Sequence, residues 1–228
     1  MILYHFSYDL AYFGLFDVGF FRSGIGLNTA RLIGGTFIFL AGLSLTLSYR
    51  RAEGSRSSRR GLFWKYLGRG LRIFSYGLTI TFLTWIFLPK EMIVFGILHL
   101  IGASIILAYP FLGLKLPNVA LGAACIAAGL YLHGFDNSWL VWLGTRPGFF
   151  MLDYWPILPW FGVMLLGVFA GNTLYGDGRK RDASPSAWPP AVRPFAFLGR
   201  HSLLVYLVHQ PILLTVLILL GIGNARIP

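Results

Sequence analysis

The sequence predicts an all-α, polytopic integral membrane protein, a helical bundle with about seven membrane-spanning helices. Of its 228 residues, 56% are hydrophobic and only 12% are charged, whereas soluble proteins carry roughly 25% charged residues. The mean hydropathy is +0.68, and the apolar residues fall into separate runs of about the 20 residues that a helix needs to cross a bilayer. No repeat or internal boundary divides the chain, so we expect one membrane-embedded domain over residues 1–228.

The candidate spans are bounded by charged residues or by Pro/Gly clusters. They cover residues 1–16, 28–48, 70–88, 92–111, 116–133, 157–175 and 201–222. The first run is too short to cross a bilayer comfortably. It also starts abruptly at Met1, without the basic residues that open a signal peptide. We therefore expect the first helix to lack its beginning.

Lysine and arginine positions predict the orientation, since cytoplasmic loops are enriched in these residues. The segments 49–69 and 176–200 are predicted cytoplasmic loops. With its flanking residues, this side carries 14 basic and three acidic residues, and the other side carries five of each. The predicted topology in the cell membrane has the N-terminus inside and the C-terminus outside. The net charge of +11 is thus mainly an orientation signal and does not indicate nucleic-acid binding; a secondary role in binding anionic lipid or a phosphorylated ligand stays open.

Metal and disulfide chemistry find little support in the sequence. Cys125 is the only cysteine, which excludes a disulfide framework and a multi-cysteine metal site. A zinc site built from His5, His99 and His209 is conceivable, but these histidines lack ligand spacing. We expect no metal.

Ionisable side chains inside predicted spans are candidates for function, because each costs free energy in the bilayer. His5 and Asp9 are four residues apart and share a helix face, so the carboxylate could set the tautomer of the imidazole. His99 lies about 10 Å below the outer edge and His209 about 12 Å above the inner edge, at 1.5 Å per residue. The alternative is that such a histidine only bonds a neighbouring helix.

A second polar group is predicted on the outer side. Asp153 and Tyr154 open a segment, 153–160, that contains two prolines and leads into the span at 157–175. Prolines there favour a non-helical start with exposed backbone groups, which are tolerated only beside protein or a water-filled cavity. We therefore expect an outward-facing polar cavity that includes Arg31. Arg31 and Asp153 could instead form an ion pair that fixes helix packing.

Four segments resemble the prokaryotic relatives of heparan-alpha-glucosaminide N-acetyltransferase. They are Gly34–Ser44 after Arg31, Phe95–His99, Asp153–Gly162 and Gly199–Pro211. Their order and spacing match the family along nearly the whole chain.

This resemblance implies an acyltransferase that takes an acetyl group from cytoplasmic acetyl-CoA and delivers it to an extracytoplasmic sugar amine or hydroxyl. It places His5 in the active region as a base or transient acyl acceptor, with Asp9 as its orienting carboxylate. His209 would line the thioester or acceptor path, and His99, where relatives often have Gln, would supply a hydrogen bond. Acetyl-CoA carries phosphates, which three basic residues near the inner ends of helices could hold: Arg69, Arg72 and Arg200.

Two other classes stay open. A transporter for a small anion or a lipid-linked substrate also places histidines at mid-membrane, but it predicts broken helices in two repeated halves, and the sequence shows no such repeat. A non-catalytic membrane subunit would need no linked polar residues at a common depth. The expected partners are the lipid bilayer, acetyl-CoA and a sugar-like acceptor; a homodimer is compatible with the sequence.

Overall fold

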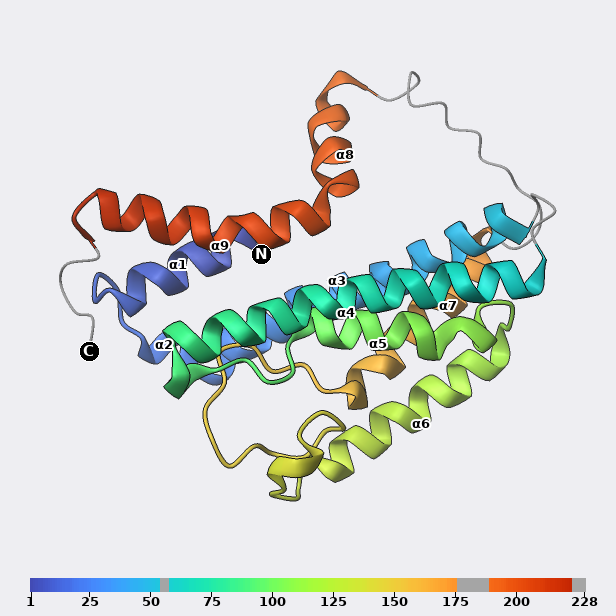
Figure 1. Ribbon diagram of the computed structural model, residues 1–228, viewed down its shortest axis with the longest axis horizontal. Helices are drawn as coiled ribbons and strands as arrows, with labels where there is room; N and C mark the ends of the chain where they lie inside the picture. The colour runs from blue at the N-terminus through green and yellow to red at the C-terminus, as the bar shows by residue number, and fades with distance from the viewer. Residues whose placement is uncertain (54–57, 176–188, 223–228) are drawn as a thin grey trace. The chain divides into compact units, whose positions relative to one another are not determined.

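The computed structural model describes residues 1–53, 58–175 and 189–222, and every regular element in these ranges is a helix (Figure 1). The all-α prediction is confirmed. The α-helices are α1 (Ile2–Tyr12), α2 (Gly19–Arg22), α3 (Gly24–Glu53), α4 (Arg59–Phe87), α5 (Ile97–Ala108), α6 (Leu116–Leu132), α7 (Ile157–Tyr175), α8 (Arg193–Arg200) and α9 (Ser202–Leu219). Short 3₁₀ turns are η1 (Pro89–Glu91), η2 (Tyr109–Phe111), η3 (Ser138–Leu140) and η5 (Pro190–Val192).

The apolar helices identify a membrane protein. Among the described residues, α3, α4, α7 and α9 are long and apolar enough to cross a bilayer, while α6 and the stretch of α5 with η2 are shorter apolar helices. The 11 residues of α1 rise about 16 Å at 1.5 Å per residue, about half of a hydrocarbon core about 30 Å thick. Four of the seven predicted spans therefore have spanning length.

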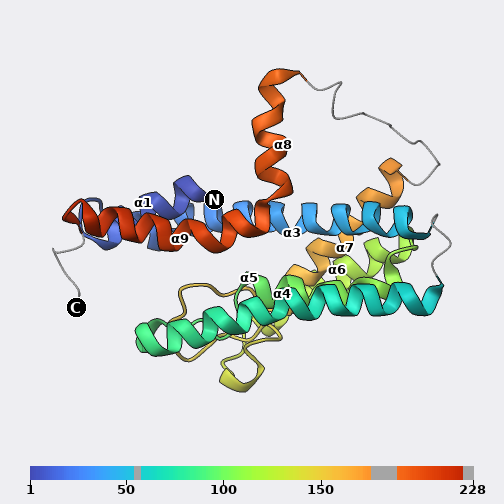
Figure 2. The same cartoon turned by 45° about the horizontal axis from the view of Figure 1, so that its top comes forward.

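The chain forms two compact units. The first comprises Met1–Ile33 and Lys180–Pro228, and the second comprises Gly34–Arg179. Within the first unit, α1 lies alongside α9, as Figures 1 and 2 both show. The Tyr4 hydroxyl donates to the Gly26 carbonyl at 3.2 Å, and Phe21 packs edge-on against Tyr4 and Tyr8. These contacts fold the start of α3 back onto α1.

Glycines bring the helices of the second unit close together. A Cβ atom at Gly70 of α4 would lie 2.7 Å from the Gly102 carbonyl oxygen of α5, and one at Gly162 of α7 would lie 2.5 Å from the Gly122 carbonyl oxygen of α6. Small residues at such contacts are typical of membrane helix packing, because they let two backbones approach. The closely packed pairs are thus α4 with α5 and α6 with α7.

Helix α4 begins earlier than the sequence indicated. Its predicted start near residue 70 is wrong, since the helix starts at Arg59, where the Ser58 hydroxyl accepts a hydrogen bond from the Gly61 amide at 3.1 Å. Such an N-cap stabilises a helix start. Residues 49–53 and 59–69 of the predicted loop are helical; residues 54–57, like 176–188 of the other predicted loop, lie outside the described residues.

Candidate active site

Four polar residues of the first unit meet between α1 and α9, and we call them the α1–α9 cluster: His5, Asp9, His209 and Gln210. Asp9 is 3% exposed and His209 is 7% exposed. The rings of His5 and His209 meet edge to face, with centroids 4.9 Å apart. Gln210 Nε2 donates a 2.7 Å hydrogen bond to Asp9 Oδ1. The predicted pair of His5 and Asp9 is therefore brought together with His209, which the sequence placed on another helix.

The backbone of α9 fixes the protonation pattern of His209. One turn earlier, the Tyr206 carbonyl accepts a 2.6 Å hydrogen bond from His209 Nδ1. A carbonyl oxygen only accepts, so Nδ1 carries the hydrogen, and in the neutral ring Nε2 holds a free lone pair.

The α1–α9 cluster has acceptor atoms without donors. Asp9 Oδ2, His209 Nε2 and Gln210 Oε1 are buried and have no hydrogen-bond partner. No lysine or arginine among residues 1–53, 58–175 and 189–222 forms an ion pair with Asp9. Buried polar atoms in proteins are nearly always satisfied. The cluster is therefore suited to a ligand group that donates hydrogen bonds.

The contacts of Asp9 differ from those expected. Its hydrogen bond goes to Gln210, and within the described part of the chain no hydrogen bond joins it to His5. Gln210 was missed in the sequence because its hydrogen-bond partner, Asp9, lies on another helix. Its position in the Gly199–Pro211 segment was the one available signal.

His99 belongs to the second unit, where it caps α5 from its N3 position. It is 2% exposed, and its Nδ1 accepts a hydrogen bond from the Gly96 amide at 3.2 Å. In the neutral ring, Nε2 then carries the hydrogen and donates to Thr81 Oγ1 at 3.3 Å. The Thr81 hydroxyl in turn donates a hydrogen bond to the Ile93 carbonyl at 2.6 Å. Both ring nitrogens of His99 are thus engaged within the protein.

Asp153 and Tyr154 also make contacts that hold the second unit together. Asp153 Oδ2 accepts a hydrogen bond from the Ile97 amide at 3.0 Å. Ile97 is the N-terminal residue of α5, where the helix dipole favours a negative charge. The Tyr154 hydroxyl donates to the carbonyls of Val141, at 2.9 Å, and Thr145. Burial raises the pKa of Tyr154 to about 12, which keeps the hydroxyl protonated. Substrate contacts by these two residues stay predictions.

The segment 153–156 that leads into α7 is non-helical as predicted, and the first turn of α7 is itself irregular, with Leu158 at φ −100° and ψ 131°. Its backbone is not left exposed, however. The amide groups of Trp155, Ile157 and Leu158 donate to the carbonyls of Phe95 and of residues 142–143 at 2.9–3.1 Å. The expectation of exposed backbone amides is wrong at these three residues, because neighbouring loops supply the acceptors. The segment therefore gives no support to a water-filled cavity.

The predicted phosphate-binding arginines are accessible. Arg69 and Arg72 are exposed on α4, and Arg200 is exposed at the end of α8; Arg31 is exposed in α3. Arg69 and Arg72 are three residues apart, which places both side chains on one face of α4. Their binding roles stay predictions. Among the residues described, no group of three or more His, Cys, Asp or Glu side chains is arranged to hold a metal ion.

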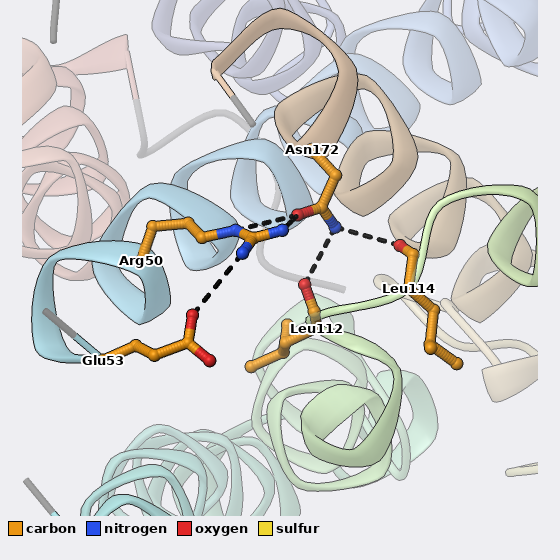
Figure 3. A network of polar contacts seen from close by, with 5 residues as sticks. All are labelled: Arg50, Glu53, Leu112, Leu114 and Asn172. Carbon is orange, nitrogen blue, oxygen red and sulfur yellow. Dashed lines mark hydrogen bonds and ion pairs between the residues drawn. The ribbon is translucent and has the colours of Figure 1, made fainter. Parts of the chain in front are cut away.

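A polar network that the sequence did not reveal joins α3, α7 and the turn before α6 (Figure 3). Asn172 is fully buried, and its Oδ1 accepts from Arg50 Nε and Nη2 at 3.2 and 2.9 Å. Asn172 Nδ2 donates to the carbonyls of Leu112 and Leu114 at 2.8 and 3.0 Å. Arg50 also contacts Glu53 at 3.5 Å. An asparagine within the apolar run 157–175 was the available signal, and Arg50 was read only as a topology residue.

Comparison with known proteins identifies the family. Neither a search of curated proteins nor a search of solved structures gave a match. The family model described as "Heparan-alpha-glucosaminide N-acetyltransferase, catalytic" matches residues 1–211. That range contains α1, α7, α9 as far as Pro211, and the whole α1–α9 cluster. Together with the apolar helices, it indicates a transmembrane acetyltransferase, and the chain belongs to the heparan-alpha-glucosaminide N-acetyltransferase catalytic family.

Proposed function

We propose that this protein transfers an acetyl group from cytoplasmic acetyl-CoA to an amine or hydroxyl of a sugar-like acceptor on the opposite side of the cell membrane. The observation that carries the proposal is the α1–α9 cluster in a chain of this family. It combines two touching imidazoles, a buried carboxylate and three acceptor atoms that lack donors. The orientation, with the N-terminus inside and the C-terminus outside, rests on the lysine and arginine bias.

The chemistry of thioester aminolysis or alcoholysis suits this cluster. The attacking nitrogen or oxygen must lose a proton, and a neutral imidazole is a base near physiological pH. It is also a nucleophile that is able to hold an acyl group transiently. The unpartnered oxygens Asp9 Oδ2 and Gln210 Oε1 would accept hydrogen bonds from the N–H or O–H groups of the acceptor and so orient it.

The donor would be held by exposed arginines of α4 and α8. Guanidinium groups bind phosphate with two parallel hydrogen bonds, and acetyl-CoA presents phosphates at its nucleotide end. Arg69 and Arg72, which share a face of α4, and Arg200 of α8 are the proposed contacts. The proposal needs no metal.

Transfer across a membrane tests the proposal directly. The purified protein is reconstituted in vesicles that enclose glucosamine, and acetyl-CoA with a labelled acetyl group is added outside. We expect labelled product inside the vesicles. Parallel vesicles that enclose N-acetylglucosamine, which offers only hydroxyls, distinguish N-transfer from O-transfer. If neither sugar becomes labelled, the proposed transfer to a sugar-like acceptor is wrong.

Binding of the donor is tested separately by calorimetry in detergent. Arg69→Ala and Arg72→Ala are expected to weaken acetyl-CoA binding, each by about tenfold, as the loss of about 1.4 kcal/mol of a charge-assisted contact implies. Arg60→Ala is the matched control, since Arg60 is an exposed arginine of α4 on a different face of the helix. Equal effects of all three substitutions would contradict the proposed phosphate site.

A further inference from the structure

We infer that His209 is the base that removes the proton from the acceptor, and that His5 positions the His209 ring; the inference rests on the proposed acetyl transfer. It starts from the hydrogen bond of His209 Nδ1 to the Tyr206 carbonyl at 2.6 Å. That bond leaves the lone pair on Nε2, and Nε2 is a buried atom without a partner. The α1–α9 cluster thus contains a proton acceptor that no donor occupies.

The five histidines, all within the described residues, differ in whether a ring nitrogen is buried without a hydrogen-bond partner. His99 uses both ring nitrogens within its own unit. His133 and His201 are exposed. Among the described residues, no hydrogen bond fixes the tautomer of His5, and its ring lies against the rings of His209 and Tyr4. His209 therefore combines a fixed tautomer with a buried, unpartnered nitrogen.

The surrounding residues suit a base at Nε2. The edge-to-face contact with His5, at 4.9 Å between centroids, limits rotation of the His209 ring. Gln210 follows His209 directly in α9 and holds Asp9 by its amide, which keeps a carboxylate in the same cluster.

The step balances without a further reactant. The acceptor nitrogen or oxygen forms a bond to the carbonyl carbon of the thioester while its proton moves to His209 Nε2. The C–S bond breaks, and its electron pair leaves on the sulfur of CoA. Nε2 then gives the proton to that thiolate, which yields free CoA, the acetylated acceptor and a neutral His209.

A substitution that keeps the hydrogen-bond donor of His209 but removes its basic nitrogen tests the inference in the vesicle assay. His209→Asn retains an amide that reaches the Tyr206 carbonyl in place of Nδ1 but has no basic lone pair. We expect kcat to fall by at least about 100-fold, as loss of a general base implies, with KM changed by less than about threefold. Thermal unfolding and size-exclusion profiles should match those of the unaltered protein.

Chemical rescue distinguishes a base from a structural residue. Added imidazole should restore a part of the activity of His209→Ala that increases with imidazole concentration, and it should not restore His5→Ala. His201→Ala, in which an exposed histidine beside α9 loses a similar bond to a backbone carbonyl, should keep full activity. Full activity of folded His209→Asn, or rescue of His5→Ala alone, overturns the inference. Absence of transfer by the unaltered protein instead contradicts the proposed function.

Discussion

Gln210 Nε2 donates a 2.7 Å hydrogen bond to Asp9 Oδ1 and thereby joins two residues that are 201 positions apart in the sequence. The bond links α1 to α9 within one compact unit. It also uses one oxygen of the carboxylate and leaves the other, Oδ2, buried and without a partner. One amide therefore both anchors the short first helix and decides which carboxylate oxygen is available.

Replacement of Gln210 should destabilise the first unit. In Gln210→Leu, Asp9 Oδ1 also loses its partner, and an unsatisfied buried acceptor costs about 1–3 kcal/mol. We expect a lower unfolding temperature in detergent. The double variant Asp9→Leu with Gln210→Leu should be less destabilised than the sum of the two single variants, because the two residues are coupled. Simple additivity of the two effects would mean that this bond does not contribute to stability.

Two glycines of α4 should respond oppositely to alanine. A Cβ atom at Gly77 would lie 2.9 Å from atoms of the His99 ring, whereas one at Gly68 would have no neighbour within 4 Å. Gly77→Ala is expected to destabilise the protein by about 1–3 kcal/mol through overpacking. Gly68→Ala should be neutral or stabilise it by up to about 1 kcal/mol, through helix propensity. Thermal unfolding of both variants side by side checks this, and a neutral Gly77→Ala would show that the His99 ring is not held in place.

The Asn172 network should contribute more to stability than its exposed neighbours. Asn172→Leu removes the donor to two carbonyls and the acceptor of Arg50, and we expect a loss of about 2 kcal/mol or more. Arg51→Ala, an exposed arginine in the same last turn of α3, is the control and should be close to neutral. Chemical denaturation of the detergent-solubilised variants measures both effects. Similar small losses in the two variants would refute a structural role for Asn172.

Two aspartates in loops of the second unit should differ in how much they contribute to stability. Asp153→Ala removes the acceptor for the first amide of α5, and loss of such a helix cap costs about 0.5–2 kcal/mol. Asp136 pairs with Arg146 at 3.2 Å, with side chains that are 78% and 52% exposed. Exposed pairs of this kind contribute little, so Asp136→Ala should leave the unfolding temperature nearly unchanged. A larger effect at Asp136 than at Asp153 would contradict this assignment of the cap.

Hydropathy predicted much of the helical architecture. The span predicted at 157–175 coincides with α7, and the one at 201–222 contains α9, because long apolar runs without charges have few alternatives in a bilayer. The start of α4 was missed because basic residues were assigned to a loop, although arginine and lysine favour helices. Charge indicates the side of the membrane and does not decide where a helix begins.

The candidate site was predictable in parts, as the His5–Asp9 pair on one helix and His209 on another. His5, Asp9 and His209 were found because ionisable residues are rare in apolar runs. Their grouping depends on which helices are neighbours, which depth along single helices does not reveal. His99 and Asp153 raised the same signal, yet they cap α5. Gln210 and Asn172 are uncharged, so a search for ionisable groups passed over both.

The wide sequence separation of Asp9 and Gln210 also bears on how the protein is made. Chains are synthesised from the N-terminus at about 5–20 residues per second, so about 10–40 seconds pass between the synthesis of the two residues. During that interval the carboxylate of α1 has no amide partner from α9. The nascent chain is therefore unable to complete the α1–α9 cluster before Gln210 has been synthesised, and a ribosome that stalls earlier leaves α1 in the membrane without its partner helix.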